Sequence, residues 1–368
     1  MSKMVILVSM SLHIPLPALP APDSVPSLRL GMFGTGWITE EFATSTMKHT
    51  AQQIVTVASR TPGKAQEFAE KFDVPEFDES YESLVARNDI DAVYIATRPG
   101  DHLDHALLAI AAGKHVLIEK PIAMSPLDAA AIFSAAKAAG VFAMEAMWNR
   151  YLPQASIVRQ ILDQGLIGTP ELMLVDFCQD QTADPRKWDP NHGTIMFDMG
   201  IYPVAFALEI MGVPTNVRAM GRLHESGTEA EATVVMDFAS GSRAIFTLSG
   251  LTHAPHHATI AGSDGIIEFK TPFVVPSGIS LIPSGFNQAG VTWLDESDIQ
   301  GHQGLCYEAT AFAQFVGEGL TESPLHPHAE SVEALRLVHE IVRQLGATYL
   351  PSKNSVNISY NHATHLLL

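Results

Sequence analysis

Apolar runs of strand length alternate with helical patterns between residue 28 and about residue 146, and this alternation constrains the fold most. Strand–helix alternation at this spacing predicts a parallel, doubly wound sheet with helices on both faces. One of the helical patterns is Pro62–Phe72, which carries proline in its expected first turn. The expected strands are Leu28–Phe33, Ile54–Ala58, Ala92–Ala96, His115–Ile118 and Val141–Met144.

The pattern changes after Trp148. A helix is expected at Ile195–Met211, and from Asn216 to about Lys270 apolar and polar residues alternate, which predicts an antiparallel sheet with one buried face. Residues 271–295 are expected to be loop or edge strand. The resulting division is a flexible extension (1–27), a dinucleotide-binding domain (28–148), a substrate-binding and oligomerisation α+β domain with an open, mostly antiparallel sheet (149–351) and a tail (352–368).

Composition excludes several classes of protein. The formal charge of −18 argues against nucleic acid as a partner, because phosphates require a basic surface. No stretch reaches the roughly 20 apolar residues that span a bilayer, which argues against a membrane protein. The two cysteines form no CxxC pair, which fits a reducing, cytoplasmic location. Met4–Leu12 resembles a short signal sequence, so secretion is the lesser alternative.

Gly34-Thr35-Gly36 follows the first strand and opens a helix with Trp37 and Ile38. The first glycine permits a tight turn, and the second lets the backbone approach a pyrophosphate at the helix N-terminus. We therefore expect a dinucleotide to bind here. A Rossmann domain is the fold class in which this turn has that role.

The end of the second strand bears on the choice of cofactor. Many NAD sites place a carboxylate there to bind the ribose 2′-hydroxyl, whereas this chain has Ser59 and Arg60, with Lys64 one turn later. A hydroxyl and a guanidinium suit a 2′-phosphate, so NADP is favoured over NAD. The alternative is that Arg60 is an ordinary surface arginine.

Glu119-Lys120-Pro121 closes the strand at residues 115–118, at the edge of the sheet where such folds bind ligands. A lysine is rarely buried there without a partner or a task. Thr97 and Arg98, at the end of the neighbouring strand, are expected to line the nicotinamide side together with His102. His102 could equally be a satisfied histidine at a helix start.

Asp198 and Tyr202 are four residues apart in a helical pattern and so share one face. A carboxylate and a phenol could bind a substrate hydroxyl and move its proton, and a nearby Lys120 ammonium would lower the phenol pKa. The alternative is that Asp198 caps the helix or pairs locally and that Tyr202 is a core residue.

Three further residues are expected to bind substrate, namely Trp148 and Arg150 at the domain junction and His192 in the loop before Asp198. For Trp148 and Arg150 the alternative is packing between the domains. His253, His256 and His257 have no carboxylate or cysteine at ligand spacing, so no metal site is predicted.

With these motifs the chain resembles the glucose–fructose oxidoreductase, inositol dehydrogenase and rhizopine-catabolism (Gfo/Idh/MocA) family. The resemblance rests on Gly34-x-Gly36, on AGKHVLIEKP at residues 112–121 and on Asp198-x-Gly200-x-Tyr202. MEAMWNRYLP (144–153) and GLTESPLHP (319–327) resemble the branch of dimeric dihydrodiol dehydrogenases and NADP-dependent D-xylose dehydrogenases.

The resemblance implies a catalytic Lys120, a branch-specific catalytic Tyr202 and a substrate-binding Asp198. It also implies a homodimer or homotetramer formed through the exposed sheet, and a Lys120-Pro121 bond that X–Pro chemistry allows to be cis. The expected function is NADP-dependent hydride transfer with an aldose such as D-xylose or with a vicinal diol. The alternatives are a keto-sugar reductase and a non-catalytic NADP-sensing regulator.

Overall fold

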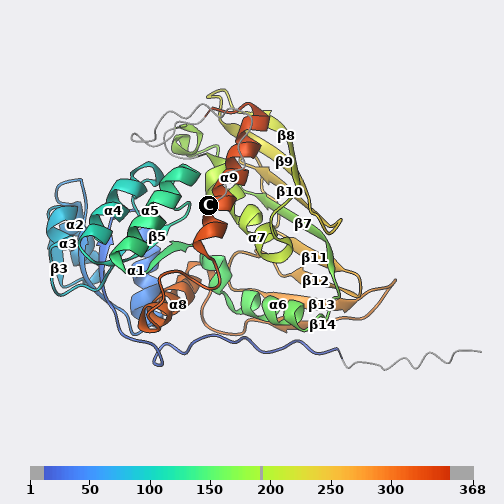
Figure 1. The fold of residues 1–368 in the computed structure, drawn as a ribbon, viewed down its shortest axis with the longest axis horizontal. Coiled ribbons are helices and arrows are strands. Elements are labelled where there is room, and N and C mark those ends of the chain that lie inside the picture. Colours follow the sequence, from blue (N-terminus) through green and yellow to red (C-terminus); the bar gives the residue numbers. More distant parts are fainter. Residues whose placement is uncertain (1–11, 191–193, 349–368) are drawn as a thin grey trace, which may run out of the picture.

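The computed structural model describes residues 12–190 and 194–348, and it contains two β-sheets separated by helices (Figure 1). A parallel sheet with helices on both faces forms the N-terminal part. A larger, mostly antiparallel sheet lies at the other side of the molecule and has helices against one face only. The predicted fold class is therefore confirmed.

The N-terminal sheet has six parallel strands in the order β3-β2-β1-β4-β5-β6. The order reverses between β1 and β4, and in such sheets a ligand binds at the carboxyl ends of the strands next to that reversal. The strands are β1 Arg29–Phe33, β2 Gln53–Ala58, β3 Glu76–Asp78, β4 Ala92–Ile95, β5 His115–Glu119 and β6 Ala143–Ala146, and the helices are α1 Trp37–His49, α2 Lys64–Phe72, α3 Tyr81–Val85, α4 His102–Ala111 and α5 Pro126–Ala139, with a 3₁₀ turn η1 at Pro99–Asp101.

Pro62 lies outside α2, contrary to the sequence prediction. The helix begins at Lys64, after Gly63 at φ +79°. A residue in this left-handed region cannot belong to a right-handed helix, so the turn at Gly63 separates Pro62 from α2.

The second sheet has eight strands in the order β14-β13-β12-β11-β7-β10-β9-β8. Its pairs are antiparallel except β7 with β10, which run parallel. Residues 271–295, expected to be loop or edge strand, contain the edge strand β14 and its neighbour β13. The elements are α6 Pro153–Asp163, β7 Pro170–Cys178, α7 Ile201–Met211, β8 Asn216–Leu223, β9 Glu229–Asp237, β10 Arg243–Ser249, β11 Ala258–Gly262, β12 Gly265–Phe269, β13 Gly278–Pro283, β14 Val291–Leu294, α8 Leu305–Gly317 and α9 His328–Leu345, with short turns η2 Trp148–Tyr151, η3 Pro185–Trp188 and η5 Gly301–Gly304.

The helix expected at 195–211 is not regular. Residues Met196–Gly200 form a π-helical turn, η4, and α7 begins only at Ile201. Pro203 has no N–H to donate to the carbonyl of Met199, so a regular α-helical ladder cannot run through this point. Wide π turns of this kind often occur at functional sites, and this one contains Asp198.

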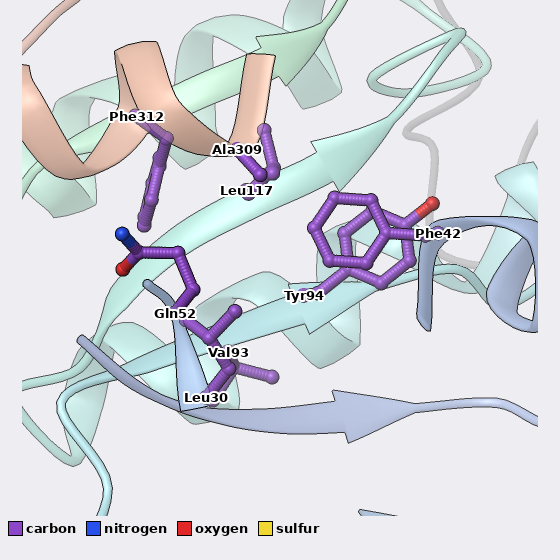
Figure 2. Close-up of a pocket in the computed structure, with 8 residues that line it drawn as sticks. All are labelled: Leu30, Phe42, Gln52, Val93, Tyr94, Leu117, Ala309 and Phe312. Carbon is purple, nitrogen blue, oxygen red and sulfur yellow. The ribbon is translucent and has the colours of Figure 1, made fainter. Parts of the chain in front are cut away.

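Helix α8 follows the second sheet in the chain but packs against the N-terminal domain. Figure 2 shows Ala309 and Phe312 of α8 beside Leu117 of β5 and Tyr94 of β4. Tyr94 also stacks on Phe42 of α1, with ring centroids 3.8 Å apart. The two parts of the chain therefore share one continuous apolar core.

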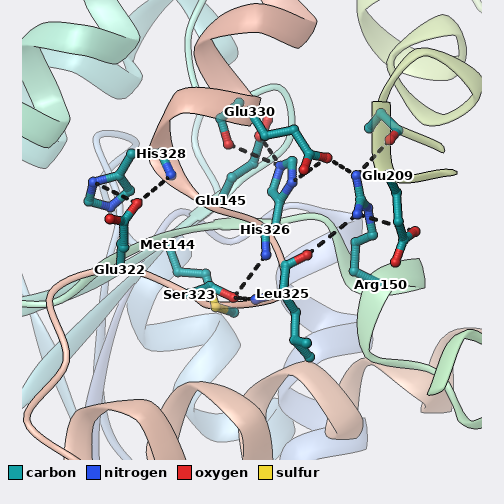
Figure 3. Close-up of polar contacts among 12 residues, drawn as sticks. Met144, Glu145, Arg150, Glu209, Glu322, Ser323, Leu325, His326, His328 and Glu330 are labelled. Atoms are coloured by element: carbon teal, nitrogen blue, oxygen red, sulfur yellow. Dashed lines mark hydrogen bonds and ion pairs between the residues drawn. The ribbon is translucent and has the colours of Figure 1, made fainter. Parts of the chain in front are cut away.

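A buried polar network also joins the two parts (Figure 3). Arg150 is only 1% exposed; it binds the carboxylates of Glu209, at 3.2 Å, and of Glu330, and it donates to the Ala205 carbonyl at 2.6 Å. His326 lies 2.9 Å from Glu145. Each buried charge has an opposite charge or a hydrogen-bond partner, as burial requires.

Residues 12–27, expected to be flexible, pack along the second domain and α8 (Figure 1). The backbone N–H of Ala18 donates to the Ser156 hydroxyl at 2.9 Å, and that hydroxyl donates to the Ala18 carbonyl at 3.1 Å. Gln160 donates to the Leu16 carbonyl at 2.9 Å. The expected tail at 352–368 lies outside the described residues.

Candidate active site

The Gly34-Thr35-Gly36 turn connects β1 to the N-terminus of α1, as predicted. Gly34 has φ +99°, and a Cβ there would lie 2.7 Å from the Ala96 carbonyl oxygen, so only glycine fits. A Cβ at Gly36 would meet no atom within 4 Å, and no side chain caps the helix. The first N–H groups of α1, which include those of Trp37 and Ile38, therefore remain able to bind a pyrophosphate.

Ser59 and Arg60 lie beyond the end of β2 and line two grooves of about 380 and 440 Å³. The Arg60 guanidinium is 50% exposed and lies 3.0 Å from the Asp101 carboxylate of η1. Lys64 pairs with Glu67 at 2.6 Å and does not line either groove, so the structure does not bring it together with Ser59 and Arg60.

The expected nicotinamide side contains residues that hold the backbone in place. His102 is fully buried, and its ring nitrogens lie 3.0 Å from the Pro121 carbonyl and 3.1 Å from the Thr97 carbonyl. Burial lowers the pKa of His102 to about 4, and a neutral imidazole has one N–H, so the ring donates to only one of these two carbonyls at a time. Both contacts of His102 are thus with the backbone, while the Arg98 side chain is exposed.

The catalytic residues expected from the sequence lie together. The Lys120 ammonium is 2.7 Å from Oδ1 of Asp198 and also donates to the Asp198 carbonyl at 2.9 Å. It lies 5.1 Å from the centre of the Tyr202 ring. The predicted cis Lys120-Pro121 bond is present. The cluster thus joins the end of β5, in one domain, to η4 and α7 in the other.

The charges in this cluster shift one another's pKa. Burial is the largest single effect and acts to raise the pKa of Asp198 and to lower that of Lys120. The attraction between the two groups, their hydrogen bond and the other charges nearby together outweigh it, so Asp198 has a lowered and Lys120 a raised pKa. Burial raises the pKa of Tyr202 to about 12, although the Lys120 charge acts to lower it. We predicted a net lowering for this phenol, which is wrong because desolvation is larger than the attraction.

Trp148 lies against the catalytic cluster, as expected, whereas Arg150 does not. The Trp148 indole N–H donates to the Tyr202 hydroxyl at 2.9 Å. The guanidinium of Arg150 is occupied in the buried network of Figure 3, and we remove it from the expected substrate site. His192 lies outside the described residues.

Sequence reasoning missed two residues of this site. The Lys187 ammonium, in η3, lies 2.5 Å from Oδ2 of Asp198. The His302 ring stacks on Trp148 at 5.5 Å and contacts the edge of Trp37 at 4.8 Å. Both belong to short turns that carry no periodic signal, so only their positions in space connect them to the site.

Among residues 12–190 and 194–348, no group of three His, Cys, Asp or Glu side chains could hold a metal ion. His256, one of the three histidines noted in the sequence, lies 3.0 Å from the Cys178 carbonyl. Within the same ranges, no helix combines the length and the apolar character that crossing a bilayer requires.

Known families match most of the chain. An oxidoreductase family with an NAD-binding Rossmann fold matches residues 28–147, and the GFO/IDH/MocA C-terminal domain matches residues 156–268. The chain belongs to the Gfo/Idh/MocA family of oxidoreductases.

Within that family, the chain is 32% identical to trans-1,2-dihydrobenzene-1,2-diol dehydrogenase of Mus musculus, over 89% of this chain and 99% of the relative. The corresponding human protein is 29% identical over the same shares of the two chains.

Solved structures share the fold. A levoglucosan dehydrogenase in complex with NADH and levoglucosan superposes with a TM-score of 0.78 and 19% identity, over 87% of this chain and 97% of the other. A 3-ketoreductase from Actinomadura kijaniata in complex with NADP superposes with a TM-score of 0.74 and 24% identity, over 89% of this chain and 100% of the other. Cofactors of both kinds thus occur on this fold.

Two further carboxyl groups, those of Glu119 and Glu308, are buried close to Lys120. Glu119 is buried; it accepts a hydrogen bond from the Tyr94 hydroxyl at 2.7 Å and one from the Lys120 backbone N–H at 3.1 Å. Glu308 of α8 is fully buried near Glu119, and neither of its oxygens has a hydrogen-bond partner. Burial, and next the Glu119 charge, raise the pKa of Glu308 well above its usual value, which favours the neutral form of this carboxyl.

We expect Glu308→Gln to change how stability depends on pH. The pKa of Glu308 is higher in the folded protein than in the unfolded chain, so its protonation stabilises the fold in full below the unfolded-state pKa of about 4.3. This stabilisation is lost as the pH rises through the folded-state pKa. Glutamine does not titrate, so the free energy of unfolding of the variant should rise relative to that of the wild type by up to about 1.4 kcal/mol for each pH unit in this range. Urea unfolding at pH 5, 7 and 9 measures this gain. The exposed Glu318→Gln is the control, and parallel curves for Glu308→Gln and wild type would contradict the assignment.

Proposed function

We propose that this protein is an NADP-dependent dehydrogenase that oxidises a vicinal diol or the hydroxyl of an aldose such as D-xylose. The observation that carries the proposal is the cluster of Lys120, Asp198 and Tyr202 beside the strand ends of a dinucleotide-binding sheet. The family relatives named as diol dehydrogenases support the substrate class.

In this proposal the Asp198 carboxylate accepts a hydrogen bond from the substrate, and Tyr202 accepts the proton of the reacting hydroxyl. Because the pKa of Tyr202 is raised to about 12, the phenolate that accepts this proton is a minor species at pH 7 and becomes more abundant as the pH rises. A bound NADP⁺ would supply the hydride acceptor there: the alcohol would lose its carbinol hydrogen as hydride and become a carbonyl, and the hydroxyl proton would remain on Tyr202. Lys120 stabilises the phenolate by its charge, and the Trp148 N–H holds the phenol oxygen in place. Asp198 in turn holds Lys120 as an ammonium.

Tyr202→Phe removes the proposed proton acceptor, and Lys120→Met removes the charge that stabilises it. Each variant should lower kcat by about 10²- to 10⁴-fold, the usual contribution of general acid–base catalysis. Steady-state assays over a panel of sugars and diols measure this loss. Tyr307→Phe, a tyrosine on α8 outside the cluster, should keep wild-type kcat. Turnover retained in Tyr202→Phe would remove the tyrosine from the mechanism.

The choice of NADP rests on Ser59 and Arg60. Both line the two grooves beyond β2, where the adenosine ribose of a bound dinucleotide lies in this fold. A 2′-phosphate would attract Arg60 away from Asp101, since a doubly charged phosphate offers more charge than one carboxylate. A ribose 2′-hydroxyl would leave the Arg60–Asp101 pair intact.

Arg60→Ala should weaken NADPH binding by about 10- to 100-fold, the effect of one lost charge-assisted hydrogen bond of about 1.5–3 kcal/mol. NADH binding should stay nearly constant. Fluorescence titration with both cofactors measures the two affinities, and Lys64→Ala, whose partner is Glu67, is the matched control. An equal loss for both cofactors would contradict selection through Arg60.

The assembly we propose is a homodimer or homotetramer formed through the outer face of the eight-stranded sheet. Within residues 12–190 and 194–348, helices cover only the other face. The outer face carries apolar side chains, among them Leu174 of β7 and Met220 of β8, which are 42% and 73% exposed. Exposed apolar side chains gathered on one sheet face are typical of an interaction surface.

Light scattering should give two or four times the chain mass for the wild type. Leu174→Glu places a charge within the proposed interface and should shift the protein toward monomer, because an unpaired charge is costly to bury. Leu16→Glu, on the N-terminal segment, should keep the wild-type mass. A monomeric wild type would exclude this assembly.

A further inference from the structure

Asp198 is bound by two lysines, one on each carboxylate oxygen. Lys120 donates to Oδ1 at 2.7 Å, and Lys187 donates to Oδ2 at 2.5 Å. Lys187 lies in η3, eleven residues before Asp198 in the chain. The mechanism above uses only one of these ammonium groups.

The two lysines differ in how they are held. Lys120 makes two hydrogen bonds to Asp198 and has a side chain that is 15% exposed. The side chain of Lys187 is 33% exposed, so it lies on the more open side of the carboxylate. A lysine ammonium has three donors on a flexible stem, so Lys187 can keep one bond to Asp198 and offer another donor to a ligand.

The neighbouring cation does not compete for this position. Arg186 pairs with Asp184 at 2.8 Å, and its guanidinium is 76% exposed. Lys187 is thus the residue of η3 that reaches the catalytic carboxylate.

We propose that Lys187 is a substrate-binding residue that recognises the second oxygen of a vicinal diol; this rests on the function proposed above. A substrate hydroxyl that hydrogen-bonds to Asp198 lies beside Oδ2, and the oxygen on the adjacent carbon then lies on the side of Lys187. An ammonium donates to that oxygen, whereas a simple alcohol has no oxygen there. Lys187 therefore selects diols over monohydric alcohols.

The test compares trans-cyclohexane-1,2-diol with cyclohexanol, each assayed as substrate and as competitive inhibitor, so that binding is measured even where turnover is slow. Lys187→Met should lower kcat/KM for the diol by about 10- to 100-fold, the effect of one lost charged hydrogen bond of about 1.5–3 kcal/mol, mainly through a higher KM. For cyclohexanol, kcat/KM and the inhibition constant should change less than about threefold. Lys187→Arg keeps the charge and should recover part of the diol activity.

Lys71→Met is the matched control, since Lys71 pairs with Glu40 on α1. This variant should leave the kinetic constants for both the diol and cyclohexanol unchanged. An equal loss for diol and cyclohexanol in Lys187→Met would show that Lys187 acts only by steadying Asp198, which overturns the proposal. No loss for either compound overturns it as well. A wild-type enzyme without activity on any diol or sugar would remove the proposed function itself, an outcome distinct from the first two.

Discussion

The ion pair between Lys120 and Asp198 is the contact on which the site depends, because its two members come from different domains. Lys120 directly follows β5 of the parallel sheet, and Asp198 lies in the π turn before α7. Desolvating two charges is costly, and only close geometry and further hydrogen bonds offset that cost. The second bond from Lys120, to the Asp198 carbonyl, supplies part of this geometry. Any shift between the domains would therefore disturb the catalytic cluster.

Several buried groups fix the backbone around this lysine. The Glu145 carboxylate accepts from the Ile122 N–H at 2.9 Å, and His102 contacts the Pro121 carbonyl. Burial alone would raise the pKa of Glu145, but the hydrogen bond with His326 and its charge lower it, so Glu145 stays ionised. The hydrogen bond between Glu145 and Ile122 thus connects the network of Figure 3 to the turn that carries Lys120. Its buried polar residues hold the backbone next to Lys120 in place.

Periodicity predicted both sheets, since a parallel sheet buried on both faces and a half-buried antiparallel sheet leave different patterns in the chain. The grouping of Lys120, Asp198 and Tyr202 was also foreseeable from residue type, spacing and position at a strand end. The sequence does not reveal how far each group is desolvated, which is why the net pKa shift of Tyr202 was predicted with the wrong sign. It did not reveal Lys187 either, since a lysine in an irregular segment resembles a solvated one.

The two ends of the proposed cofactor site use charge in the same way. At the catalytic end Asp198 already has ammonium partners before a substrate binds, and at the nucleotide end Arg60 already has Asp101. At the nucleotide end a ligand has to replace Asp101 as the partner of Arg60, so only the difference between the old and the new interaction contributes to affinity. At the catalytic end a diol oxygen adds to the existing bond between Lys187 and Asp198. A phosphate in place of one carboxylate, or a diol oxygen added beside Asp198, provides such a difference, whereas a ligand without that group does not. Selectivity for both cofactor and substrate then follows from the same physical constraint.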